Sequence, residues 1–347
     1  MNTSKLQAFA TDARRQLMNA VQTRLDAALV PNSDAQVDDP RAFAFLKREI
    51  EQAGGSEQGR KHVVERYSYR WFNRIIAFRY MDVHGFTGTP VVSSAGLTST
   101  NGLPEVLAAA KRGEYDDNTV FSLRVNDKAK ERIEGLLSGS IMADDPQGRA
   151  YGLLLQSECR FWNHNLPFMF ESVGKEAGRV DELLMPADLL AEGSVLRNAV
   201  EVMTPEDCGV DDPSGNVEII GWLYQYYISE RKNEVMDGFK KNHKAGAEEI
   251  PAATQLFTPD WIVRYLVQNT VGRLWIQSHP DSQLYKNWDY YIQPSEDDSA
   301  GNEDILAIRT PEDLTVCDPA CGSGHMLTYA FDLLYEIYEE EGYAPSD

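Results

Sequence analysis

The sequence has 347 residues and a formal net charge of −21; 42% of the residues are hydrophobic and 25% are charged. Average glycine and proline usage excludes collagen-like and low-complexity proteins, and no apolar run reaches the roughly 18 residues that would cross a membrane. The strong negative charge excludes a chain that wraps nucleic acid with its whole surface. Four cysteines and the lack of a secretory signal pattern predict a reduced, cytoplasmic setting.

Apolar residues at three- and four-residue steps predict helices along the front of the chain. The expected helices are 5–29, 41–52, 61–83, 104–112, 127–139, 149–170, 188–201 and 217–246. Residues 86–102 are rich in Thr, Ser and Gly and are expected to form a loop, either ordered or mobile. Residues 1–245 are therefore predicted to be a mainly α-helical N-terminal domain.

The helix expected at 61–83 carries a stripe of arginines. Arg66, Arg70 and Arg74 recur every four residues and share one helix face. Two interpretations stay open: the guanidinium groups would contact DNA phosphates, or they would pair with carboxylates of this acidic chain. We favour the ion pairs.

The pattern changes near residue 246. A helix is expected at 260–274, an acidic linker at 296–303, a strand at 314–317 and a helix at 326–340. A strand, a glycine loop and a helix in that order open a doubly wound α/β sheet of the Rossmann-like kind. Residues 246–347 are therefore predicted to hold the incomplete start of such a domain.

Two segments have the local chemistry of a binding site for an anionic group. In the glycine loop, Pro319 stiffens the exit from the strand, and Gly322 and Gly324 permit a positive φ and a close approach of the ligand. At the start of the 260–274 helix, Thr258 is a good N-cap and Pro259 a good first helical residue. The free N–H groups of both helices would then face the ligand.

Both segments resemble cofactor-binding elements of adenine-specific DNA methyltransferases. Residues 318–324 (DPACGSG) match the family's S-adenosyl-L-methionine loop, although Met326 stands where Phe is usual. Residues 255–263 (QLFTPDWIV) resemble the element that holds the amino-acid end of the cofactor. The resemblance implies S-adenosyl-L-methionine as cofactor, with these binding residues: Thr258, Pro259, Asp318, Pro319, Ala320, Cys321, Gly322, Ser323 and Gly324.

Three further stretches narrow the resemblance to the large methyltransferase of BREX phage-defence systems, the PglX type. They are residues 66–74, 221–227 and 250–259. Such an enzyme would flip an adenine out of double-stranded DNA and methylate its amine, which marks host DNA as self. Double-stranded DNA would be the substrate of the whole enzyme, and other BREX proteins are candidate partners.

The second motif of the family is missing. It consists of Asn or Asp, then Pro-Pro and an aromatic, and the sequence contains no Pro-Pro and no Asn-Pro. No catalytic residue is assigned, and the chain is predicted to be an N-terminal part that is inactive alone. Because a lone strand cannot form a stable sheet, residues after about 300 are expected to pack poorly, or to lean on the helical domain or a second chain.

Other functions and sites compete with this one. A helical interaction module of the defence complex, without catalysis, would also suit the acidity and the missing motif. An acidic mimic of DNA ranks last, because the glycine loop has no role in it. No metal site is expected: Cys317, Cys321 and His325 lack a second pair of zinc ligands. Cys317 and the six tryptophans are expected to lie in the core.

Overall fold

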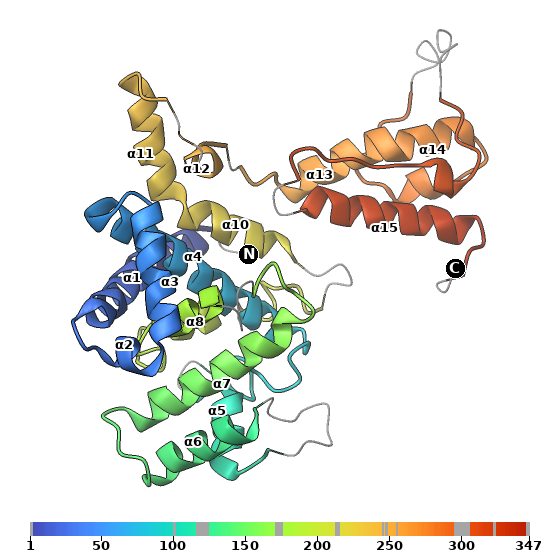
Figure 1. Ribbon diagram of the computed structural model, residues 1–347. Helices are drawn as coiled ribbons and strands as arrows, with labels where there is room; N and C mark the ends of the chain where they lie inside the picture. The colour runs from blue at the N-terminus through green and yellow to red at the C-terminus, as the bar shows by residue number, and fades with distance from the viewer. Residues whose placement is uncertain are drawn as a thin grey trace. The chain divides into compact units, whose positions relative to one another are not determined.

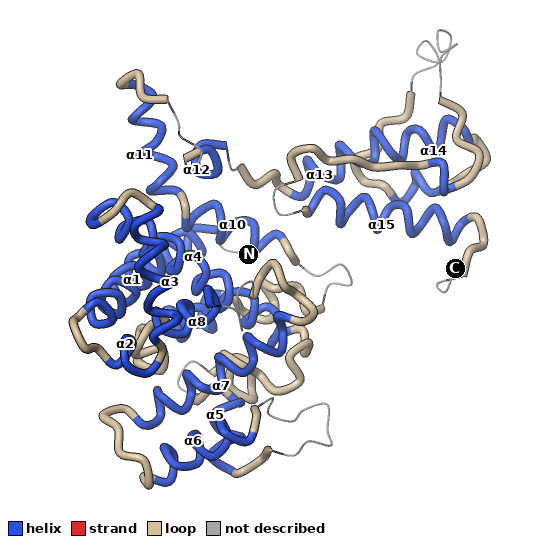
Figure 2. The backbone as a smooth tube through the Cα atoms, in the orientation of Figure 1, coloured by secondary structure: helices blue, strands red, loops and turns tan. Residues whose placement is uncertain are grey.

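The chain is largely helical, as a computed structural model shows. The structure describes residues 3–99, 102–115, 125–170, 176–211, 216–244, 246, 249–254, 256–294, 306–321 and 324–344. Figure 2 shows helices and loops and, over these residues, no strand. The chain divides into two compact units, Met1–Glu230 and Arg231–Asp347, whereas the sequence placed the boundary between residues 245 and 246. Among the described helices, none has the length and apolar character that the interior of a bilayer demands.

The first unit is a helical bundle. Its described helices, labelled in part in Figure 1, are α1 (Thr3–Leu29), α2 (Asp34–Asp38), α3 (Pro40–Gln52), α4 (Ser56–Val83), α5 (Glu105–Arg112), α6 (Asp127–Ser138), α7 (Pro146–Asn163), α8 (Glu176–Leu183), α9 (Val195–Val202) and α10 (Glu218–Tyr227). Most of them match the helices predicted from apolar spacing. Helix α9 begins later than predicted, because Asp188 has a left-handed φ of 57° and Ser194 caps the helix at the Arg197 N–H.

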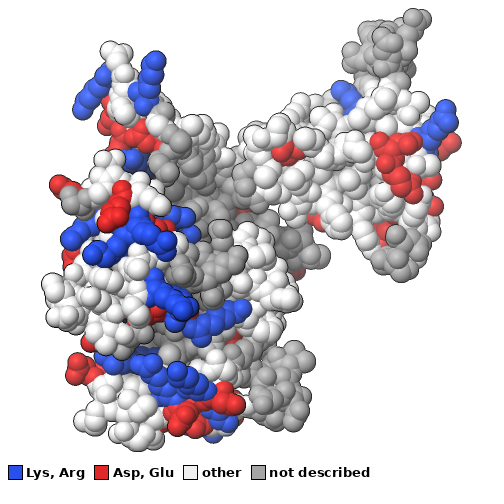
Figure 3. Space-filling view, viewed as in Figure 1, with Lys and Arg blue, Asp and Glu red and all other residues white. Residues whose placement is uncertain are grey.

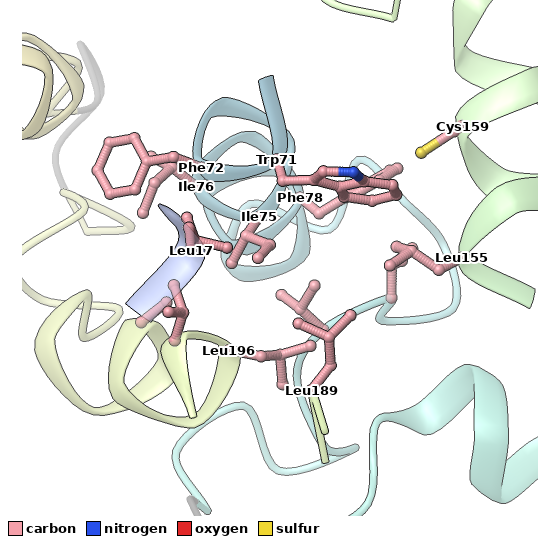
Figure 4. Close-up of a cluster of buried hydrophobic side chains, with 14 of the residues drawn as sticks. Leu17, Trp71, Phe72, Ile75, Ile76, Phe78, Leu155, Cys159, Leu189 and Leu196 are labelled. Atoms are coloured by element: carbon pink, nitrogen blue, oxygen red, sulfur yellow. The ribbon is translucent and has the colours of Figure 1, made fainter. Parts of the chain in front are cut away.

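Helix α4 lies at the centre of this unit, and its buried side chains project in several directions. Figure 4 draws part of the core: Leu17, Trp71, Ile75, Phe78, Leu155 and Leu196. Burial of each large apolar side chain contributes about 1.5–3 kcal/mol. The polar residues Arg74, Arg79 and Asp82 of the same helix are buried as well, so each of them needs a buried partner.

The loop after α4 is anchored by one such residue. Asp82 accepts hydrogen bonds of 2.8–2.9 Å from the Thr87 hydroxyl and from the backbone N–H groups of Val91, Val92 and Ser93. Four donors offset the cost of burying this carboxylate. Of the two forms expected for this loop, its described residues therefore adopt the ordered one.

The second unit is made of shorter elements. It holds most of α11 (Ser229–Lys240), then α12 (Ile250–Thr254), α13 (Asp260–Val267), a π-helical turn η1 (Gln268–Gly272), α14 (Arg273–Ser278), the 3-10 turns η2 (Leu284–Asn287) and η4 (Pro311–Asp313), and α15 (His325–Glu340). The prediction of a single helix at 217–246 is wrong, because the helix is interrupted at Ile228, between α10 and α11. There the Ser229 hydroxyl donates to the Tyr226 carbonyl and competes with the helical hydrogen bonds.

The π turn interrupts the helix that was predicted at 260–274. A π turn closes its hydrogen bonds over one more residue than an α turn. Its last residue, Gly272, lies so close to Trp288 that a Cβ atom would come within 2.7 Å of the indole ring. The turn also buries Gln268, which is 1% exposed.

The predicted strand at 314–317 does not form. These residues follow η4 as a loop, and Val316 and Cys317 are exposed, so the expectation that Cys317 lies in the core is also wrong. A strand needs a partner for its N–H and C=O groups, and none is present in the described part of the chain. The described residues of the second unit are helices and loops, and the expected Rossmann-like start is not seen among them.

Helix α15 is nevertheless well packed on its inner face. Ala330, Leu333 and Ile337 are buried in one cluster with Val263 of α13 and Trp275 of α14. The expectation of poor packing after residue 300 is therefore wrong for this helix. The second unit has its own apolar core, which fixes α13 and α15 relative to each other.

Candidate cofactor site

The two segments that the sequence assigned to the cofactor meet in the second unit. The Nε2 atom of His325, the first residue of α15, lies 3.0 Å from the carbonyl oxygen of Thr258. The His325 ring also stacks on Phe257, with ring centroids 4.4 Å apart. Figure 1 shows α13 and α15 side by side, starting from the same end. Residues 67 positions apart in the chain therefore form one local site.

Helix α13 begins at Asp260, the first residue of the predicted helix, but its cap is not the predicted one. Its N-cap is Pro259, with extended φ and ψ of −56° and 146°, and the Pro259 carbonyl accepts from the Ile262 and Val263 N–H groups. The prediction of Thr258 as N-cap and Pro259 as first helical residue is therefore wrong by one position. The Thr258 carbonyl instead faces His325.

The glycine loop is a compact turn as far as it is described. Asp318 Oδ1 accepts from the Ala320 N–H at 3.0 Å, and the Cys321 carbonyl accepts from the Gly324 N–H at 2.7 Å. Pro319, Ala320 and Cys321 are exposed. Gly324 has a φ of 79° and leads into α15, a conformation that favours glycine. The predicted binding residues Gly322 and Ser323 lie outside the described residues.

The site suits the anionic end of a ligand. Gly324 and Pro259 are the N-caps of α15 and α13, and neither contributes a side-chain hydrogen bond to its helix. The first-turn N–H groups of a helix carry partial positive charge. Two helix N-termini that meet at one place therefore favour a carboxylate, such as the amino-acid end of S-adenosyl-L-methionine.

A second layer of polar contacts supports the site from within. Gln268 donates to the Tyr329 hydroxyl at 2.6 Å and accepts from the Tyr290 N–H at 2.8 Å. The Arg264 guanidinium lies over the Tyr329 ring and is bonded to Asp260 at 2.6 Å. Sequence reasoning missed these residues and the role of His325, because spacing along the chain does not show that α13 and α15 are neighbours.

The arginine stripe of α4 forms ion pairs within the first unit. Arg66 pairs with Glu49 at 2.9 Å, and Asp181 receives both Arg70 at 3.5 Å and Arg74 at 3.0 Å. Arg74 is 1% exposed, so its proposed contact with DNA is wrong, and Arg70 shares the same carboxylate. Figure 3 shows acidic and basic side chains next to each other on this unit. Among the described residues, no three His, Cys, Asp or Glu side chains are grouped to hold a metal ion.

Comparison with known proteins finds two long relatives. The chain is 38% identical over 371 aligned residues to the adenine-specific methyltransferase BrxX of Escherichia coli O9:H4 (strain HS), an alignment covering 100% of the chain and 28% of that protein. It is 36% identical over 296 residues to the adenine-specific methyltransferase PglX of Lacticaseibacillus casei (strain Zhang), covering 81% of the chain and 23% of that protein. The chain thus spans about a quarter of the length of these curated relatives. No protein-family model matches it.

Proposed function

Because the chain belongs to the family of the BrxX and PglX adenine-specific methyltransferases, and matches the N-terminal part of those longer proteins, we propose that it forms the cofactor-binding front of an S-adenosyl-L-methionine-dependent DNA adenine methyltransferase of a BREX phage-defence system. The contact between His325 and the Thr258 carbonyl carries the proposal. It joins the start of α15, directly after the glycine loop, to the Thr-Pro segment, the other segment assigned to the cofactor.

Each part of the site has a distinct task in this proposal. The N-termini of α13 and α15 attract the carboxylate of the cofactor. Thr258 and Pro259 flank that end, and the loop 318–324 passes beneath the cofactor. Gly324 has no Cβ atom, so the backbone can approach a ligand closely. The cofactor itself would supply a methyl group activated by its sulfonium.

Methyl transfer needs groups that this sequence lacks. It contains no Pro-Pro and no Asn-Pro, so no residue is assigned to bind a flipped adenine. The chain alone is therefore proposed to bind cofactor without transferring its methyl group. Double-stranded DNA as substrate, other BREX proteins as partners and a cytoplasmic location belong to the proposal for the longer enzyme.

Isothermal calorimetry with S-adenosyl-L-methionine tests the proposal. The 347-residue chain should bind the cofactor, and Gly324→Ala should weaken binding about tenfold or more, since an alanine at positive φ strains the loop. Gly342→Ala is the matched control: both glycines have positive φ, and a Cβ atom added at either would meet no other atom within 4 Å. A wild-type chain that gives no binding heat would refute the proposed function.

A second candidate is an interaction module without catalysis. The outer face of α15 exposes Leu327, Phe331 and Tyr335, at 37%, 66% and 40% of their surface. These residues are four positions apart and form one apolar stripe, with the Phe331 and Tyr335 ring centroids 6.4 Å apart. Such a stripe is typical of a surface that packs against other protein. The calorimetric titration separates the two functions, because the module alone would not require a cofactor.

A further inference from the structure

His325 contacts the segment before α13 in two ways. Its Nε2 atom lies 3.0 Å from the Thr258 carbonyl oxygen, and its ring stacks on Phe257 with an interplanar angle of 27°. Phe257 is 6% exposed, so the ring that His325 meets is itself held in place. A carbonyl oxygen only accepts hydrogen bonds, so the Nε2 atom carries the proton at this contact.

Two groups of this segment are contacted by His325. Pro259 has no backbone N–H group to donate, and its φ and ψ are extended. The carbonyl of Thr258 and the ring of Phe257 are two groups through which the segment is held from α15. His325 uses both of them.

We propose that His325 is a positioning residue that fixes residues 257–259 against the N-terminus of α15, and so sets the separation of the two halves of the cofactor site. This inference rests on the function proposed above. The polar link between Gln268 and Tyr329 lies about one helical turn further along α15. It holds the two helices together, whereas His325 holds the end at which the cofactor would bind.

Two substitutions separate the hydrogen bond from the ring. His325→Phe keeps an aromatic ring for stacking and removes the donor, whereas His325→Gln keeps an N–H donor near the position of Nε2 and removes the ring. If the donor fixes the segment, His325→Phe lowers the fraction of chains with a correctly placed site. Affinity for S-adenosyl-L-methionine should then fall about tenfold, and His325→Gln should recover it to within about threefold.

His279→Phe is the matched control. His279 lies in the same unit, stacks on Trp275 with ring centroids 3.7 Å apart, and its Nδ1 atom lies 3.3 Å from the Trp275 carbonyl oxygen. It therefore makes the same two kinds of contact without touching residues 257–259. This variant should bind the cofactor as the wild type does.

Hydrogen exchange of the full chain, measured without cofactor, gives the second readout. His325→Phe should speed exchange of the backbone amides in 256–263, and neither His325→Gln nor His279→Phe should do so. A wild-type chain that binds no cofactor would refute the proposed function, while the exchange data would still report whether His325 fixes the segment. Unchanged exchange and affinity in His325→Phe, or equal impairment in His325→Gln, would overturn the positioning role alone.

Discussion

Substitution of Asp181 by alanine would leave two arginines of α4 without their shared carboxylate. The side chains of Asp181 and Arg74 are 1% and 2% exposed and lie 3.0 Å apart, and Arg70 lies 3.5 Å away. Removing one partner of a buried ion pair costs about 3–5 kcal/mol, because the remaining charge stays buried. For a unit of about 230 residues, each kcal/mol lowers the melting temperature by roughly 2–4 °C. The variant should therefore melt roughly 6–20 °C lower than the wild type.

Urea unfolding followed by circular dichroism would measure this loss as a lower midpoint at an unchanged slope. Glu114→Ala is the control. It breaks an ion pair with Arg112 in which the two side chains are 56% and 48% exposed, and such exposed pairs contribute at most about 1 kcal/mol. The double variant Asp181→Leu with Arg74→Met should recover much of the stability, because it removes both buried charges together. A loss below about 1 kcal/mol in Asp181→Ala would refute the reasoning.

Two further predictions concern the thiols and the outer face of α15. Burial raises the pKa of Cys159 and Cys208 to about 12, so a thiol reagent at pH about 8 should label the exposed Cys317 and Cys321 in the folded chain and spare these two. S-adenosyl-L-methionine should slow the labelling of Cys321. Equal labelling rates at all four thiols would contradict the burial of Cys159 and Cys208. Phe331→Ser should reduce the binding of an apolar dye at an unchanged melting temperature, since Phe331 is 66% exposed. A melting temperature that falls with the dye signal would show that Phe331 belongs to the core.

Most helices of the first unit could be predicted because their apolar residues follow the helical period, whereas the short helices α2 and α8 were not predicted. The same spacing could not show that α4 is surrounded by other helices. Arg70 and Arg74 looked like a stripe on an outward face, but their partner, Asp181, lies more than 100 positions further along the chain. A sequence pattern reports which residues share a face of a helix, and not what covers that face.

The candidate site was predictable in its parts and not in its assembly. The residues DPACGSG and the Thr-Pro pair marked two segments, and in the structure His325, directly after the first, contacts Thr258 of the second. His325 is separated from Thr258 by 67 positions, so its role follows only from the packing of α15 on α13. The strand at 314–317 was predicted from its composition alone, but strand formation depends on a neighbouring strand that local composition does not supply.

Because of the π turn at Gln268–Gly272, the direction in which the following side chains point depends on the number of residues in this stretch as much as on their composition. One additional residue rotates everything downstream by about 100° around the helix axis, which directs Trp275 to α15, where its indole N–H donates to Glu340. Deleting a single residue there would keep a helix-forming sequence but swing the indole out of the contact. The number of residues between Val267 and Trp275 therefore matters more than their hydrophobicity for keeping the starts of α13 and α15 together.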